Sequence, residues 1–181
     1  MNEQETMQKK NRIITIMVVF GMLVFVIVNM VKNTYSGEII FDAMQFYTGD
    51  FVTTVSEEQL INMQGQPDKT KTWNYINGAI TYSINSLQYE PNSNSSSGYT
   101  YTYDFSSGAL QRIVIEDLQL EYSSKYHILA MFGLIRSSDS FVNATDTTFK
   151  VTNCGVHDLQ VTDMNKQILN NVQITYGTIY D

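Results

Sequence analysis

The sequence predicts an α+β protein in which a single transmembrane helix precedes an extracytoplasmic domain of two similar helix-plus-antiparallel-sheet units. Three observations support this prediction: an uncharged apolar run, two short helix patterns that each end at a glycine, and several alternating segments rich in Tyr, Thr, Ile and Val. The expected parts are a cytoplasmic tail at 1–12, a transmembrane helix at 13–31, a connector at 32–52, and α+β units at 53–118 and 119–181.

Composition excludes several classes of function. The 181 residues carry 11 basic and 18 acidic side chains, which give a net charge of −7. This balance argues against a nucleic-acid binder, because such a protein needs a basic face that displaces phosphate counterions. The single cysteine, Cys154, excludes an intrachain disulfide framework and a cysteine-based zinc site. With two histidines and no calcium-loop or phosphate-loop motif, we expect no metal and no cofactor.

The apolar run at 13–31 is long enough to cross a bilayer as a helix. Nineteen residues without a charge span roughly 28 Å at about 1.5 Å per residue. The alternative, a cleaved signal peptide, has a shorter apolar core and a small-residue cleavage site, and no such site follows Val31. The run therefore predicts an uncleaved anchor.

Flanking charges predict the orientation of that anchor. Lys9, Lys10 and Arg12 precede the run and Lys32 alone follows it closely, which places the N-terminus in the cytoplasm. The expected localisation is the plasma membrane, with a single pass and the C-terminal domain outside.

The first unit begins with a short helix. Ser56 is an N-cap, Gln59 completes a capping box, and Gly65 followed by Pro67 ends the helix. Strands are expected at 79–89, 99–105 and 110–115, with a tight turn at Ser106-Ser107-Gly108 between the last two.

The second unit repeats this order. A helix opens at Ser123-Ser124-Lys125 and ends at Gly133, and strands are expected at 147–152, 155–162 and 168–176. Matching residues in the two units are separated by nearly constant offsets, and the offset falls after the polar loop at 91–98, which the second unit lacks. The matched pairs are Leu60 with Ile128, Ile84 with Val151, Asp104 with Asp163, Ile113 with Val172 and Ile115 with Ile174. This spacing predicts a tandem duplication.

The segments SEEQLINMQGQPD and YTYDFSSGALQRIVIE resemble a known extracytoplasmic architecture. They are similar to the superfamily that contains the small lipoprotein of the barrel-assembly machinery and the β-lactamase inhibitory proteins, some of which are tandem duplications. The resemblance implies a helix followed by a small antiparallel sheet, with the sheet and its hairpin as contact sites for a protein partner. The chain departs from that family in three ways: it has no lipobox cysteine, it is expected to keep a membrane anchor, and it lacks the disulfides of the inhibitory proteins.

Candidate contact residues lie on the strand at 99–105 and its turn. Tyr99, Tyr101 and Tyr103 share one strand face, which predicts either an aromatic binding platform or a row that packs under the helix. The hairpin residues Asp104 and Phe105, together with Asp163 at the matching turn, complete the expected partner-binding set.

The cluster Cys154-Gly155-Val156-His157-Asp158 invites a thiol-nucleophile interpretation, with His157 as the base. Strand geometry opposes it, because residues three apart on a strand point to opposite faces. We therefore expect a buried, non-catalytic Cys154 and no enzyme activity.

The function expected from the sequence is a membrane-anchored protein-interaction module of the cell envelope, acting as a scaffold, assembly factor or inhibitor. Its expected partner is another envelope or membrane protein. Two alternatives remain open: a sensor domain that binds a ligand or cell-wall glycan, and a subunit of a secretion or pilus-like machine.

Overall fold

The computed structural model describes residues 38–48, 53–91, 98–145, 147–162, 164–165 and 168–181. Within these ranges, no helix has the length and apolar character needed to cross a membrane. This finding contradicts the predicted single-pass protein, and with it the signal anchor and the plasma-membrane localisation. The apolar run at 13–31 lies outside the described residues.

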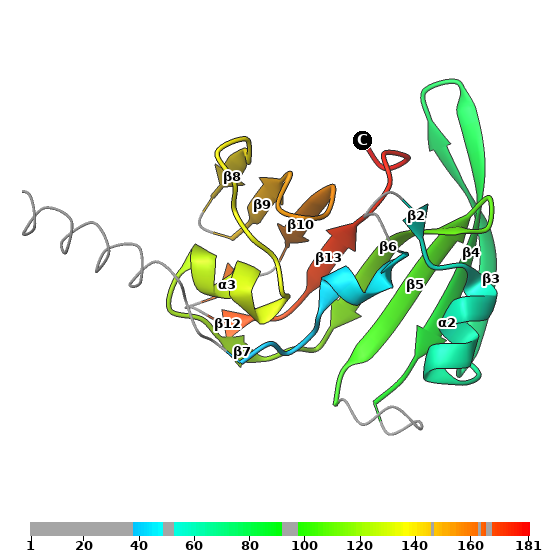
Figure 1. Ribbon diagram of the computed structural model, residues 1–181, viewed down its shortest axis with the longest axis horizontal. Coiled ribbons are helices and arrows are strands. Elements are labelled where there is room, and N and C mark those ends of the chain that lie inside the picture. The colour runs from blue at the N-terminus through cyan, green and yellow to red at the C-terminus, as the bar shows by residue number, and fades with distance from the viewer. Residues whose placement is uncertain (1–37, 49–52, 92–97, 146, 163, 166–167) are drawn as a thin grey trace, which may run out of the picture. The chain divides into compact units, whose positions relative to one another are not determined.

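Eight antiparallel strands form one continuous sheet in the order β3–β4–β5–β6–β13–β10–β9–β8 (Figure 1). Their bounds are Lys69–Asn77 (β3), Ile80–Tyr89 (β4), Thr100–Ser106 (β5), Ala109–Glu116 (β6), Val142–Ala144 (β8), Phe149–Thr152 (β9), Asp158–Val161 (β10) and Val172–Thr175 (β13). The predicted α+β layout of two units, 53–118 and 119–181, is therefore wrong: the described chain is mostly β. The reason is that the whole of β13 pairs with residues 112–115 of β6, which joins the two sets of strands through main-chain hydrogen bonds.

The described helices are short, and their ends follow local sequence signals. Helix α2 (Glu57–Gln64) has Ser56 as its N-cap, with both hydrogen bonds of the capping box present, and ends at Gly65 with φ +88°. Helix α3 (Lys125–Met131) has Ser124 as its N-cap, and Gly133 follows it with φ +66°. Both helices thus begin and end where the sequence indicated. A 3₁₀ helix, η1 (Ala43–Phe46), lies in the predicted connector.

Short strands complete the fold. Strand β1 (Tyr47–Thr48) pairs with β2 (Thr53–Thr54), and β7 (Leu120–Glu121), β12 (Ile168–Leu169) and β11 (Met164–Asn165) form a three-stranded sheet. The strand expected at 168–176 is divided between β12 and β13. The sequence interpretation missed the edge strands β3 and β8, which are short or polar.

The strand order is the same on both sides of the β6–β13 junction. Each half runs from an α-helix through four sheet strands, and the last strands of the halves pair. Val114 lies opposite Gln173, which is its counterpart at an offset of 59, so the local two-fold axis passes through this pair. The register corrects one predicted match: Val151 faces Leu159 as Tyr89 faces Tyr101, so Val151 is the counterpart of Tyr89 and not of Ile84.

One face of the sheet is covered and carries the hydrophobic core. Helices α2, α3 and η1 lie over this face (Figure 1), and Leu60, Ile128, Phe132 and Phe46 are fully buried there. Side chains alternate along each strand, so every second residue points to the opposite face. We call that opposite side the uncovered face; its half-buried residues include Gln88, Thr102, Val114, Gln160 and Gln173.

Candidate functional site

A row of polar residues crosses the uncovered face at one level of the sheet. Its members lie directly opposite one another on five neighbouring strands, and we call them the polar row: Ser86 (β4), Asp104 (β5), Arg112 (β6), Thr175 (β13) and Asp158 (β10). Four of the five are buried, with exposures of 7, 2, 4 and 4% for Ser86, Asp104, Thr175 and Asp158. Ser106 is the one further buried polar residue among the described positions. Buried polar groups need partners, so this row has to be built around specific contacts.

Asp104 is the centre of those contacts. Its carboxylate accepts hydrogen bonds from the Ser86 hydroxyl at 2.6 Å and from the Arg112 Nε and Nη2 at 2.9 and 2.7 Å. The indole Nε1 of Trp73 donates to Ser86 Oγ at 2.8 Å and extends the network to the edge strand. These bonds hold the guanidinium and the indole in fixed positions, because charge-assisted contacts with little exposure are strong.

A hollow of about 300 Å³ lies over this half of the uncovered face. Its lining residues come from β3, β4, β5 and β6 and include Lys71, Trp73, Gln88, Thr102, Arg112 and Val114. Its size is at the lower end of the range for ligand pockets, and its wall combines one aromatic ring with amide, hydroxyl and charged groups.

The cations of the hollow differ in how they are neutralised. Lys69 pairs with Glu90 and Arg112 with Asp104. Lys71 is exposed, and no ion pair of this side chain is found within the described part of the chain. The hollow thus offers the Lys71 ammonium group to an incoming anion, and the exposed Glu116 carboxylate lines the same hollow.

The last residues of the sequence lie against the same face. We call Gly177–Asp181 the strap. The ring of Tyr180 lies with its centroid 4.0 Å from the Arg112 guanidinium carbon and 4.9 Å from the centroid of Tyr75, and its hydroxyl donates to Asp104 at 3.3 Å. Burial and the neighbouring Asp104 carboxylate raise the pKa of the Tyr180 phenol well above its ordinary value.

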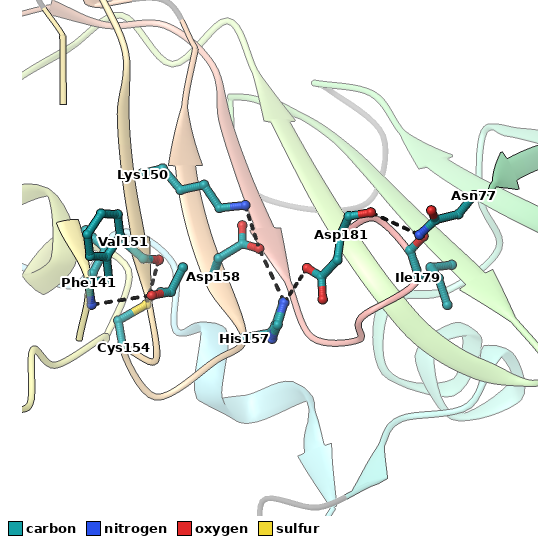
Figure 2. Close-up of polar contacts among 10 residues, drawn as sticks. Asn77, Phe141, Lys150, Val151, Cys154, His157, Asp158, Ile179 and Asp181 are labelled. Atoms are coloured by element: carbon teal, nitrogen blue, oxygen red, sulfur yellow. Dashed lines mark hydrogen bonds and ion pairs between the residues drawn. The ribbon is translucent and has the colours of Figure 1, made fainter. Parts of the chain in front are cut away.

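Side chains from two distant hairpins hold the end of the strap (Figure 2). The Asn77 amide at the end of β3 donates to the main-chain carbonyls of Ile179 at 3.1 Å and Asp181 at 3.0 Å. On the other side, His157 Nε2 and Asp181 Oδ1 lie 2.7 Å apart. The strap is therefore bound as a peptide segment, through its backbone carbonyls and two side chains.

His157, Asp158 and Asp181 bring three potential metal ligands within 4.8 Å of one another. The Lys150 ammonium lies 3.4 Å from the Asp158 carboxylate, which it neutralises, and the His157 ring is engaged by Asp181 (Figure 2). A cation would have to displace Lys150 from this position. We interpret the group as an ion-pair network that fixes the strap.

Cys154 and His157 do not form the thiol–imidazole pair considered from the sequence. The Cys154 thiol points toward the carbonyl of Val151 at 3.7 Å, whereas the His157 ring faces Asp181 (Figure 2). Cys154 is fully buried, as predicted, and burial raises its pKa to about 11. A buried, protonated thiol is a poor nucleophile.

The structure places the residues predicted to bind a partner in three environments. Tyr101 and Tyr103 are buried in the core at 5 and 2% exposure, beneath Phe41 and Phe46, and Phe105 is also buried. The tyrosine row thus packs inside, because it shares the strand face that η1 covers. Tyr99 is half-buried beside Tyr101. Asp104 is buried on the uncovered face, in the polar row, and Asp163 is outside the described residues.

Comparison with known proteins adds no relative. No family model, curated protein or solved structure matches the chain significantly. The resemblance to the inhibitory-protein superfamily stays a prediction.

Sequence reasoning missed Trp73, Lys71, Arg112 and the strap. The signal was present in part, since polar and apolar residues alternate along β4, β5 and β6, and Trp73 is the only tryptophan. What the sequence lacks is the register that brings Ser86, Asp104 and Arg112 to one level.

Proposed function

We propose that this domain is a non-enzymatic protein-interaction module that binds an extended segment of a partner protein on the uncovered face. One observation carries the proposal: this face already holds a peptide segment, the strap, through side chains that contact its backbone carbonyls and its Tyr and Asp side chains. Peptide recognition uses these same elements, with main-chain hydrogen bonds for affinity and side-chain pockets for selectivity.

The hollow beside the strap supplies the additional contact surface. Trp73 is a large, rigid aromatic group of the kind that contributes strongly to interfaces. Arg112 is held in place by Asp104, so it needs little ordering when a partner arrives. Lys71 favours a partner segment with an acidic residue at this position, because its charge is unpaired within the described chain.

The alternative of glycan binding is favoured by one feature of the same hollow. Trp73 lines the hollow together with Gln88 and Thr102, and an aromatic ring combined with amide and hydroxyl groups is also suited to a sugar. The peptide proposal ranks higher because the chain's own strap lies on this face and the face carries charged groups.

The test uses the single tryptophan as a local reporter. The full chain is used to select binders from a random peptide library, and the selected peptides are titrated while the fluorescence of Trp73 is recorded. Binding at the hollow is expected to shift or quench this emission. A glycan panel titrated in the same way tests the alternative.

Two matched arginine substitutions locate the site. Thr102→Arg places a long side chain inside the hollow, whereas Met63→Arg places one on the exposed surface of α2. We expect Thr102→Arg to weaken peptide binding at least tenfold and Met63→Arg to leave it unchanged, with both variants keeping the melting temperature within a few degrees. The proposal is wrong if the two variants bind the peptides equally well. It is also wrong if the selected peptides leave the Trp73 emission unaltered.

A further inference from the structure

We propose that the strap is a tethered competitor for the partner: it occupies one end of the binding face, and its Tyr180–Asp181 pair displays the chemistry that the partner segment presents. The expected occupant is an extended segment of another protein with an aromatic residue followed by an acidic one. This inference rests on the proposed function, since it names the partner class and the control of the same face.

The strap and the hollow share their central residues. Arg112 and Asp104 line the hollow, and both contact Tyr180, through the ring face and the hydroxyl respectively. An aromatic ring of a partner could bind between the Arg112 guanidinium and the Tyr75 ring only if Tyr180, which occupies that position, moved away. Cation–π and ring–ring contacts of this kind select an aromatic group over an aliphatic one.

The last strand, β13, and its anchor in the core precede the strap. Tyr176 is buried at 9% exposure, and its hydroxyl donates to the Ala43 carbonyl at 2.7 Å on the covered side of the sheet. Beyond it, residues 177–181 form bends and a turn without a strand. Gly177 N donates to the Gln111 carbonyl of β6 at 3.3 Å, and release of the residues after Gly177 would break no pairing between strands. These residues can therefore leave while the core stays intact.

The acidic position of the partner is defined by the second anchor. His157 holds Asp181 at 2.7 Å, and Asn77 holds the carbonyls on either side of Tyr180. A partner with an aromatic–acidic pair satisfies these groups in the same way, while a segment that lacks the acid leaves His157 Nε2 with only the Asp158 carboxylate, 3.9 Å away and already paired with Lys150. Because the strap is covalently attached, it competes at a high effective concentration.

The experiment measures the affinity of the library-selected peptides for four forms of the chain by Trp73 fluorescence. These are the full chain, Tyr180→Ala, a chain that ends at Gly177, and Ile135→Ala as a control on an exposed side chain that belongs neither to the strap nor to the hollow. We expect affinity to rise at least tenfold in Tyr180→Ala and in the shortened chain, and to be unchanged in Ile135→Ala. Melting temperatures show whether the shortened chain stays folded. If it does not, the affinity of Tyr180→Ala by itself tests whether the strap competes with the peptide.

Peptide substitutions test the chemical class. Replacing the aromatic or the acidic residue of a selected peptide by Ala should reduce its affinity at least tenfold, and a peptide with the strap sequence GTIYD should compete for the shortened chain. Unchanged or lower affinity after strap release overturns the competitor, and selected peptides without an aromatic–acidic pair overturn the partner class. In either case, if Thr102→Arg still weakens binding of the selected peptides, the proposed function stands. If no selected peptide changes the fluorescence of Trp73, the proposed function itself is wrong.

Discussion

Replacing Asp104 by Ala is expected to destabilise the protein strongly although no apolar core contact is lost. Asp104 is 2% exposed and accepts hydrogen bonds from Ser86, Arg112 and Tyr180. The substitution leaves the guanidinium of Arg112, whose side chain is 20% exposed, without its anion. Breaking a buried ion pair on one side costs about 3–5 kcal/mol, and the partial exposure of Arg112 places the loss near 3 kcal/mol.

The assay is urea unfolding followed by circular dichroism and by Trp73 fluorescence. With a slope of about 2 kcal/mol per molar urea, the Asp104→Ala midpoint should fall by roughly 1.5 M. The double variant with Arg112→Met should recover part of the loss, because no charge then remains buried alone.

Asp139→Ala is the matched control, since this carboxylate is exposed and its removal should change stability by less than about 0.5 kcal/mol. A loss of less than about 1 kcal/mol in the free energy of unfolding of Asp104→Ala is typical of a surface ion pair. That result would show that Asp104 does not hold the polar row together.

Three further expectations concern local features. The pKa of the Cys154 thiol is 9.0 in the unfolded chain and about 11 in the folded one, so stability should fall by about 2 kcal/mol as pH rises from 9 to 11. Cys154→Ala should flatten that slope in pH-dependent unfolding. Gly133→Ala should cost at least about 1 kcal/mol, because Gly133 has φ +66° and the new Cβ would lie 2.8 Å from Asp42 Oδ1, whereas Gly98→Ala, with open space around it, should be nearly neutral in the same melts. Ser56→Ala should cost about 1 kcal/mol through loss of the helix cap, and an unchanged melting temperature would show that the capping box contributes nothing.

Local structure was largely predictable because its causes are local. The capping box at Ser56 and Gln59 and the terminating Gly65 fix α2 within one turn of chain, and the structure confirms both ends. The turn between β5 and β6 follows from Ser107 and Gly108, which adopt φ +52° and +80°. These features need only neighbours in sequence, so pattern and stereochemistry suffice.

Sequence patterns predicted where α2 and α3 begin and end, most of the long strands, and the burial of Cys154. The pairing of β6 with β13 into one sheet depends on tertiary contacts, and so does the choice of the strand face that the helices cover. Alternation shows that a strand has two faces but does not show which face is buried. In the structure, Tyr101 and Tyr103 lie in the core and Asp104 lies on the opposite face. The polar row depends on the register of five strands that are up to 89 residues apart in sequence, from Ser86 to Thr175. Such pairings are set by long-range hydrogen bonds and packing, which no window of the sequence contains.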